Sequence, residues 1–197
     1  MPIKHQLVTL VFAALLISSC SSIYMPSVPN TPMLTTKGEF AGGAHISLKG
    51  NASFNTAYAV TEHFAVMANA GFMNNEGRKK DINHKVFEFG GGYFKTFGPE
   101  NNRILEIYGG LANGRSKRTF REYENDVVVS SDFYDAAYSK KFVQVNYSSK
   151  KVNDVNIFGF KFGLNYGTAW RLSFVETDDF YKNGVMQPNE DNVFLEP

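Results

Sequence analysis

Apolar and polar residues alternate with a period of two along most of the chain. In residues 39–48, for example, Ile46 and Leu48 fall on one face, whereas His45 and Ser47 fall on the other. This period is typical of a β-strand that has a different environment on each face. Similar segments follow, separated by polar or glycine-containing turns. The eight predicted strands cover residues 39–48, 52–60, 64–73, 87–97, 105–111, 143–148, 158–164 and 170–174.

Short turns join most of these strands, which favours an antiparallel meander. The sequence therefore predicts an all-β fold, an antiparallel up-and-down β-barrel of about eight strands over residues 38–177. Two longer polar loops are expected at 74–84 and 115–137, and a short turn is expected at 165–168. Residues 178–197 are expected to form a polar tail or the start of a further strand, and an incomplete last pair would make ten strands.

The two faces of the predicted strands differ in side-chain size. The interior of an eight-stranded barrel is just wide enough for side chains, so the rings of the apolar face would crowd it. The opposite face is rich in glycine. We therefore expect the rings to point outward, and a soluble lipocalin-like barrel with an apolar ligand inside is the alternative. The rings are Phe40, Phe54, Tyr58, Phe87, Phe89, Tyr93, Phe97, Tyr147, Phe158, Phe160, Phe162, Trp170 and Phe174.

Four charged residues fall on the small, glycine-rich face. They are two acids, Glu88 and Glu106, and two bases, Lys161 and Arg171. Buried charges must be paired, so these residues are expected to form a network that closes the lumen. The alternative is ordinary exposure to solvent on a soluble barrel.

The first residues are typical of a secretory signal. Lys4 precedes an apolar run at 7–17, which is shorter than the roughly 20 residues that span a bilayer. Residues 17–20, Ile-Ser-Ser-Cys, resemble the lipobox of bacterial lipoproteins. That resemblance implies that 1–19 is a lipoprotein signal peptide and that Cys20 carries fatty acyl chains such as palmitate. The proline-containing residues 20–37 are expected to form an extended, lipidated tether.

Charge and composition exclude several classes of function. The chain has 20 Lys and Arg against 19 Asp and Glu, which argues against nucleic-acid binding, because that needs a basic excess. Its single cysteine excludes an internal disulfide. His45, His63 and His84 are scattered, so neither a metal site nor a cofactor is expected. No catalytic arrangement is visible, so an enzyme is not expected, and an enzyme that modifies outer-membrane lipids is the alternative.

The lipobox, the segment 24–32 and the aromatic and glycine-rich strands together resemble small lipid-anchored outer-membrane β-barrel-type proteins of Gram-negative bacteria. The resemblance covers residues 20–175. It implies a location in the outer membrane and contact with its lipid, and it carries over no catalytic residue and no protein partner. We therefore expect a non-enzymatic protein with a structural, adhesive or envelope-maintenance role.

Basic residues gather in the two predicted long loops. They are Arg78, Lys79 and Lys80 in the first loop, and Arg115, Lys117, Arg118 and Arg121 in the second. If the chain starts on the periplasmic side, both loops lie at the outer end of the barrel. There they are expected to contact the phosphate groups of lipopolysaccharide. Because several acids follow closely, a solvated loop of mixed charge is the alternative.

Overall fold

The computed structural model describes residues 24–48, 50–157 and 160–196, and the side chains of these residues except those of 151–157 and 160–164. The predicted signal peptide and Cys20 therefore lie outside the described residues. The side chains of Phe158, Phe160, Lys161 and Phe162 do so as well.

The described residues form one antiparallel sheet of nine strands. Each strand from β1 to β7 pairs with the next one along the chain, so the topology is up-and-down, as predicted. Both β8 and β9 pair with β7, at different positions along it. The strands are β1 (Phe40–Ser47), β2 (Asn51–Ala59), β3 (Phe64–Glu76), β4 (Lys80–Phe97), β5 (Arg103–Glu124), β6 (Val127–Ile157), β7 (Phe160–Lys182), β8 (Val185–Met186) and β9 (Asp191–Glu196), with a 3₁₀ turn, η1 (Pro99–Asn101), before β5.

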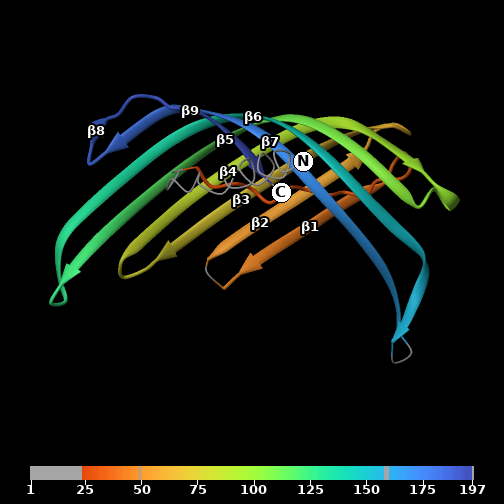
Figure 1. Cartoon of the computed structure of the whole chain (residues 1–197), viewed down its shortest axis with the longest axis horizontal. Coiled ribbons are helices and arrows are strands. Elements are labelled where there is room, and N and C mark those ends of the chain that lie inside the picture. Colours follow the sequence, from red (N-terminus) through yellow and green to blue (C-terminus); the bar gives the residue numbers. More distant parts are fainter. Residues whose placement is uncertain (1–23, 49, 158–159, 197) are drawn as a thin grey trace, which may run out of the picture.

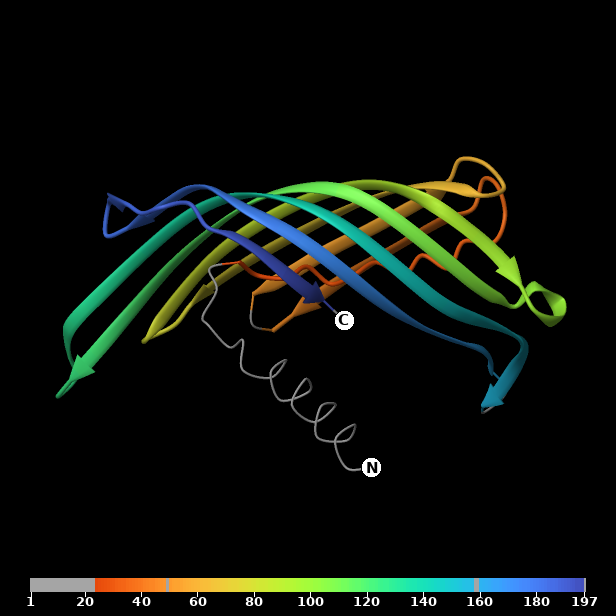
Figure 2. The same cartoon turned by 45° about the horizontal axis from the view of Figure 1, so that its top comes forward.

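The sheet arches strongly, and residues 24–37, which we call the strap, run along its concave side (Figures 1 and 2). The prediction of a closed barrel is wrong for this structure. Among the described strands, β1 pairs only with β2 and β9 only with β7, so the sheet has two free edges. Alternation along a strand sets which face is apolar, but it carries no information on whether the last strand reaches the first.

The strands are longer than predicted because the expected polar loops are strands. The β3–β4 hairpin turns at 77–79, and the β5–β6 hairpin turns at Asn125 and Asp126, both of which have positive φ, 48° and 64°. Two such residues make the tight turn that joins antiparallel strands with the right twist. The turn predicted at 165–168 lies inside β7, and the predicted tail contains β8 and β9. We call the end with the turns at 77–79 and 125–126 the hairpin end.

The expected orientation of the two faces is confirmed for the described residues. Large apolar side chains are exposed on the convex face, whereas polar and charged side chains are buried on the concave face. Of the predicted outward rings, those exposed are Phe40, Phe54, Tyr58, Phe87, Phe89, Tyr93, Tyr147, Trp170 and Phe174.

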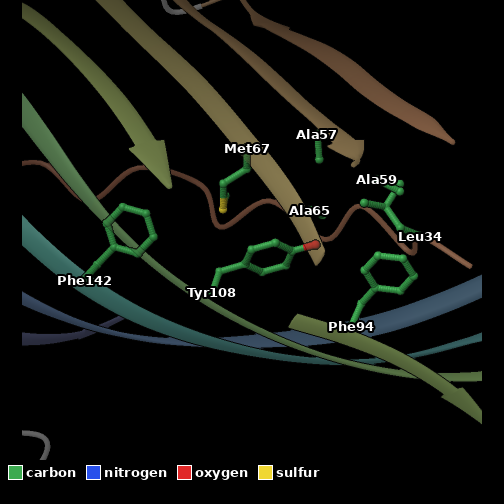
Figure 3. Packing of buried hydrophobic residues seen from close by; sticks show 8 residues of the cluster. All are labelled: Leu34, Ala57, Ala59, Ala65, Met67, Phe94, Tyr108 and Phe142. Atoms are coloured by element: carbon green, nitrogen blue, oxygen red, sulfur yellow. The ribbon is translucent and has the colours of Figure 1, made fainter. Parts of the chain in front are cut away.

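A small apolar cluster joins the strap to the concave face (Figure 3). Leu34 of the strap is fully buried there. The cluster contains Leu34, Ala57, Ala59, Ala65, Met67, Phe94, Tyr108 and Phe142. The strap is therefore packed against the sheet by hydrophobic contact as well as by the polar contacts described below.

Glycine on the concave face makes room for these rings. A Cβ atom at Gly110 would lie 2.4 Å from Cζ of Phe142 and 2.5 Å from the carbonyl oxygen of Phe89. At the adjacent Gly109 the nearest such atom is 3.8 Å away.

We expect Gly110→Ala to lower the free energy of unfolding by about 1–3 kcal/mol, the usual cost of overpacking. Gly109→Ala is the matched control and is expected to change it little. Urea unfolding of the two variants checks this, and equal midpoints would show that the ring of Phe142 does not need the space above Gly110.

Candidate functional site

The concave side of the sheet encloses a space that we call the hollow. At its centre lies a buried ion cluster around Glu88 of β4. Its carboxylate contacts Lys140 of β6 at 2.5 Å and Arg171 of β7 at 3.0 Å. Asn69 of β3 donates a further hydrogen bond at 2.9 Å. The three charged side chains are at most 1% exposed. Side chains from three other strands therefore contact this one carboxylate, and two cations share it.

Glu106 is connected to this cluster through the amide side chains of Asn146 and Gln144. Its carboxylate accepts hydrogen bonds from Asn146 at 3.1 Å, from the hydroxyl of Tyr108 at 3.2 Å and from the backbone N–H of Leu34 at 3.3 Å. Gln144 donates to Asn146 at 2.7 Å and accepts from the Arg171 guanidinium at 2.8 Å. The structure thus brings Glu88 and Arg171 together as predicted, while Glu106 binds the strap.

Two members of the cluster were not predicted. The prediction named Lys161 and Arg171 as the two bases of the network. In the structure the second base beside Arg171 is Lys140, and the side chain of Lys161 lies outside the described part. Glu196 of β9 approaches Arg171 at 3.8 Å. Extending the alternation of Gln144 and Asn146 backwards along β6 places Lys140 on the inner face, so the sequence did contain this signal. Lys140 was missed because the predicted strand began at residue 143, after a predicted loop at 115–137, whereas β6 already begins at Val127.

The start of the strap binds both the cluster and β9. The hydroxyl of Tyr24 donates to Glu196 at 2.5 Å, and its ring stacks on Phe194 at 4.7 Å between centroids. The hydroxyl of Ser27 donates to the Glu88 carboxylate. The first described residues of the strap therefore contact the sheet in two ways, by hydrogen bonds to the carboxylates of Glu196 and Glu88 and by ring stacking on Phe194.

The middle of the strap is held by amide hydrogen bonds. The backbone carbonyl of Asn30 accepts from Gln144 at 2.6 Å and from Asn146 at 3.1 Å. Its side chain donates to Asn69 at 3.2 Å. Residues 24–37 were expected to be part of an extended tether. They are extended in the structure, and they are bound to the concave face of the sheet. The reason is that the prolines exclude a strand, whereas the polar groups between them match those of the concave face.

Little empty space remains beside the strap. A space of about 40 Å³ borders Ser27, Val28 and Glu88. Polar side chains and the strap therefore fill this part of the hollow.

On the convex face, apolar residues form a band with polar margins. In β4, the exposed Lys85 and Lys95 flank residues 86–94, and the outward side chains between them include Phe87, Phe89 and Tyr93. Nine residues is the length with which a tilted strand crosses the hydrocarbon core of a bilayer. No helix in the described ranges has the length and hydropathy needed to cross a membrane.

One margin of this band is marked by tyrosines. Tyr58, Tyr93, Tyr147 and Tyr166 are exposed and lie at the end of the band away from the hairpin end. At the hairpin end the outward residues that follow the band include Asn74, Lys85, Arg115 and Lys141. Aromatic girdles at the margins of an outward apolar band are typical of outer-membrane barrels.

The structure separates the seven predicted basic contact residues. Arg115, Lys117 and Arg121 lie on the outer face of β5, whereas Arg118 is buried on the inner face. The remaining three, Arg78, Lys79 and Lys80, lie at or beside the β3–β4 turn and are exposed.

All three outer residues belong to ion pairs, and Lys117 shares Asp135 with Arg115. Arg121 is paired with Asp81, and hydrogen bonds from the guanidinium hold the pKa of the Asp81 carboxyl below its usual range. Arg115 forms two 2.8 Å hydrogen bonds to Asp135, which similarly lower the pKa of that carboxyl. Acids therefore neutralise part of the predicted basic surface.

The histidines do not converge. His84 is buried and its ring stacks against Tyr138, whereas His45 and His63 are exposed elsewhere. Within the described residues, no group of three or more His, Cys, Asp or Glu side chains is placed to hold a metal ion.

Comparison of the chain with protein-family models, with curated proteins and with solved structures found no match.

Proposed function

We propose that this protein is a lipid-anchored outer-membrane protein that presents its convex face to lipid and has a non-enzymatic structural, adhesive or envelope-maintenance role. The anchor is Cys20, and the hairpin end faces outward. Its partners are the lipids of the outer membrane, including lipopolysaccharide.

The observation that carries this proposal is the inverted distribution of polarity. A soluble protein buries its large apolar side chains and exposes its charges, and an exposed apolar area as large as this band marks a contact with protein or membrane. Here Phe87, Phe89, Leu111 and Trp170 are exposed while Arg171 is fully buried. Lipid on the convex face accounts for both features.

The hollow does not favour the lipocalin-like alternative. An apolar ligand needs an apolar pocket, but the concave face carries Glu88, Lys140, Arg171 and Gln144, and the strap lies over them. A membrane location sets one further requirement. Hydrocarbon does not tolerate unpaired backbone groups, so the free edges of β1 and β9 must gain partners in the membrane.

Fractionation of cells that express the Cys20→Ser variant tests the proposal. Because the convex band by itself holds the sheet in lipid, we expect the unlipidated variant to stay in the membrane fraction until detergent is added. The folded protein should also migrate differently on gels before and after boiling. Recovery of the variant as a soluble monomer would contradict membrane insertion.

We expect Phe89→Arg to make folding into vesicles less favourable by about 2–4 kcal/mol, the cost of an outward arginine near the bilayer midplane. Phe89 lies in the centre of residues 86–94 and is 66% exposed. Val129→Arg, near the turn of the β5–β6 hairpin, is the control, since Val129 is also exposed but lies outside the band. Urea titrations in vesicles measure both, and equal small effects would place the convex face in water.

A further inference from the structure

Three cations gather on the convex face where the apolar band ends at the hairpin end. Lys85 of β4 lies directly opposite Arg115 of β5, and Lys117 is the next outward residue along β5. Like charges directly opposite one another on neighbouring strands destabilise a sheet. The arrangement is therefore unfavourable unless an anion lies between the cations.

The chain supplies only part of that negative charge. Asp135 of β6 contacts Arg115 at 2.8 Å and Lys117 at 3.3 Å, so one carboxylate is shared by two cations. Among the ion pairs of the described residues, none includes Lys85. At the margin of the band, Lys85 is therefore a positive charge that no ion pair among the described residues balances, while Asp179 of β7 also acts on Arg115.

The three cations line an open depression of about 530 Å³, which we call the cation pocket. Its lining also includes two amides, Asn74 and Asn83, and the hydroxyl of Thr119. Glu76 and Asp81 lie on the side nearest the turn, and Asp81 is already paired with Arg121. The side nearest the apolar band is therefore the positive side.

The pocket is continuous with the apolar band. Phe72 of β3 is the register partner of Lys85, and its ring packs against Phe87 at 5.3 Å between centroids. A molecule that fits both surfaces has an anionic head beside Lys85 and Arg115 and apolar chains along the two phenylalanine rings. That is the chemistry of a phosphate-bearing membrane lipid.

We propose that the cation pocket binds a phosphate group in the head of an anionic membrane lipid. This inference rests on the proposed function, because it requires the convex band to lie in hydrocarbon. Nε and Nη2 of Arg115 donate to Asp135, and its remaining N–H groups can donate to phosphate oxygens, with the two lysines as point charges beside it. The amides of Asn74 and Asn83 supply further donors.

Binding of lipid A to the purified, lipidated full chain in detergent tests the inference. The test variant is Lys85→Gln with Lys117→Gln, and it is expected to bind lipid A at least tenfold more weakly, because two charge-assisted hydrogen bonds are lost. Asp135→Asn should bind several times more tightly, since it frees Arg115 and Lys117. The control is Lys95→Gln, an exposed lysine on the same face of β4 at the other margin, and its affinity should not change.

Two further probes separate the sources of phosphate. Dephosphorylated lipid A should bind no more tightly to the native protein than to the double variant. Inorganic phosphate at millimolar concentration should displace lipid A poorly, and displacement as effective as that by lipid A itself would assign the pocket to free phosphate and overturn the inference.

The outcomes also separate this inference from the proposed function. A protein that inserts into vesicles, but whose double variant binds lipid A as well as the native chain does, overturns the cation pocket alone. A weakening by Lys95→Gln equal to that of the double variant likewise overturns it, because binding would then follow net charge. A native protein that fails to insert overturns the proposed function and the headgroup site together.

Discussion

Replacing Glu88 by glutamine is expected to lower the free energy of unfolding by about 3–5 kcal/mol. The substitution keeps the shape of the side chain but removes the charge that Lys140 and Arg171 share, at 2.5 and 3.0 Å. Both cations are fully buried, and a buried charge without its partner is among the most destabilising changes in a protein. Denaturant unfolding of the protein in detergent micelles measures the effect.

The control for this prediction is Glu106→Gln on the same face. Its carboxylate accepts hydrogen bonds from Asn146, Tyr108 and the backbone of Leu34, and none of these donors is charged. We expect a cost of about 1 kcal/mol, the value of one hydrogen bond. If the two variants lose equal stability, the ion pairs around Glu88 do not contribute more to the free energy of unfolding than the neutral hydrogen bonds around Glu106.

Replacing Leu34 by alanine is expected to lower the free energy of unfolding by about 2–5 kcal/mol, the range for removing a large aliphatic side chain from a core. Leu34 is fully buried among residues from five strands, β2 to β6, including Phe94 and Tyr108. A strap that only tethered the sheet to an anchor would tolerate this change without any loss. The same unfolding measurement therefore tests whether the strap is part of the fold.

Val28→Ala, in the same strap, is the matched control. Val28 is 54% exposed, and substitutions at such positions usually change stability by less than about 0.5 kcal/mol. A near-zero effect at both positions would show that the strap is not docked. A large effect at both would mean that the strap is buried more extensively than the structure indicates.

The polarity of the two faces was predictable because it depends only on local geometry. Successive residues of a strand point to opposite faces, so placing Phe87 and Phe89 outward also places Glu88 inward. The same argument correctly predicted that Arg171 points to the concave face, whereas its chain neighbours Trp170 and Leu172 point to the convex face. Strand ends were less predictable, since polar residues such as Arg115 and Asp135 form cross-strand pairs in hairpins that extend beyond the apolar band.

The buried cluster was predicted only in part. The pattern indicated that the inner face carries charges that must be paired, but it could not specify partners across the hollow. Lys140 pairs with Glu88 because β4 and β6 both face the same concave side, and the two residues are 52 positions apart in the chain. The cation pocket was not predicted for a similar reason, since Lys85 lies between the predicted loop at 74–84 and the predicted strand at 87–97, while Arg115 and Lys117 were placed in a loop.

By itself, the sequence determined that this chain is an antiparallel all-β protein with rings on one face and small or charged residues on the other, because a period of two follows from the backbone of each strand. Only the tertiary structure decided how far the sheet curves, that β1 and β9 do not pair, and that the strap lies in the hollow. These features depend on contacts such as that of Tyr24 with Glu196, which are 172 positions apart. Local alternation carries no information about such distant partners, which are selected by the shape and charge of the whole concave face.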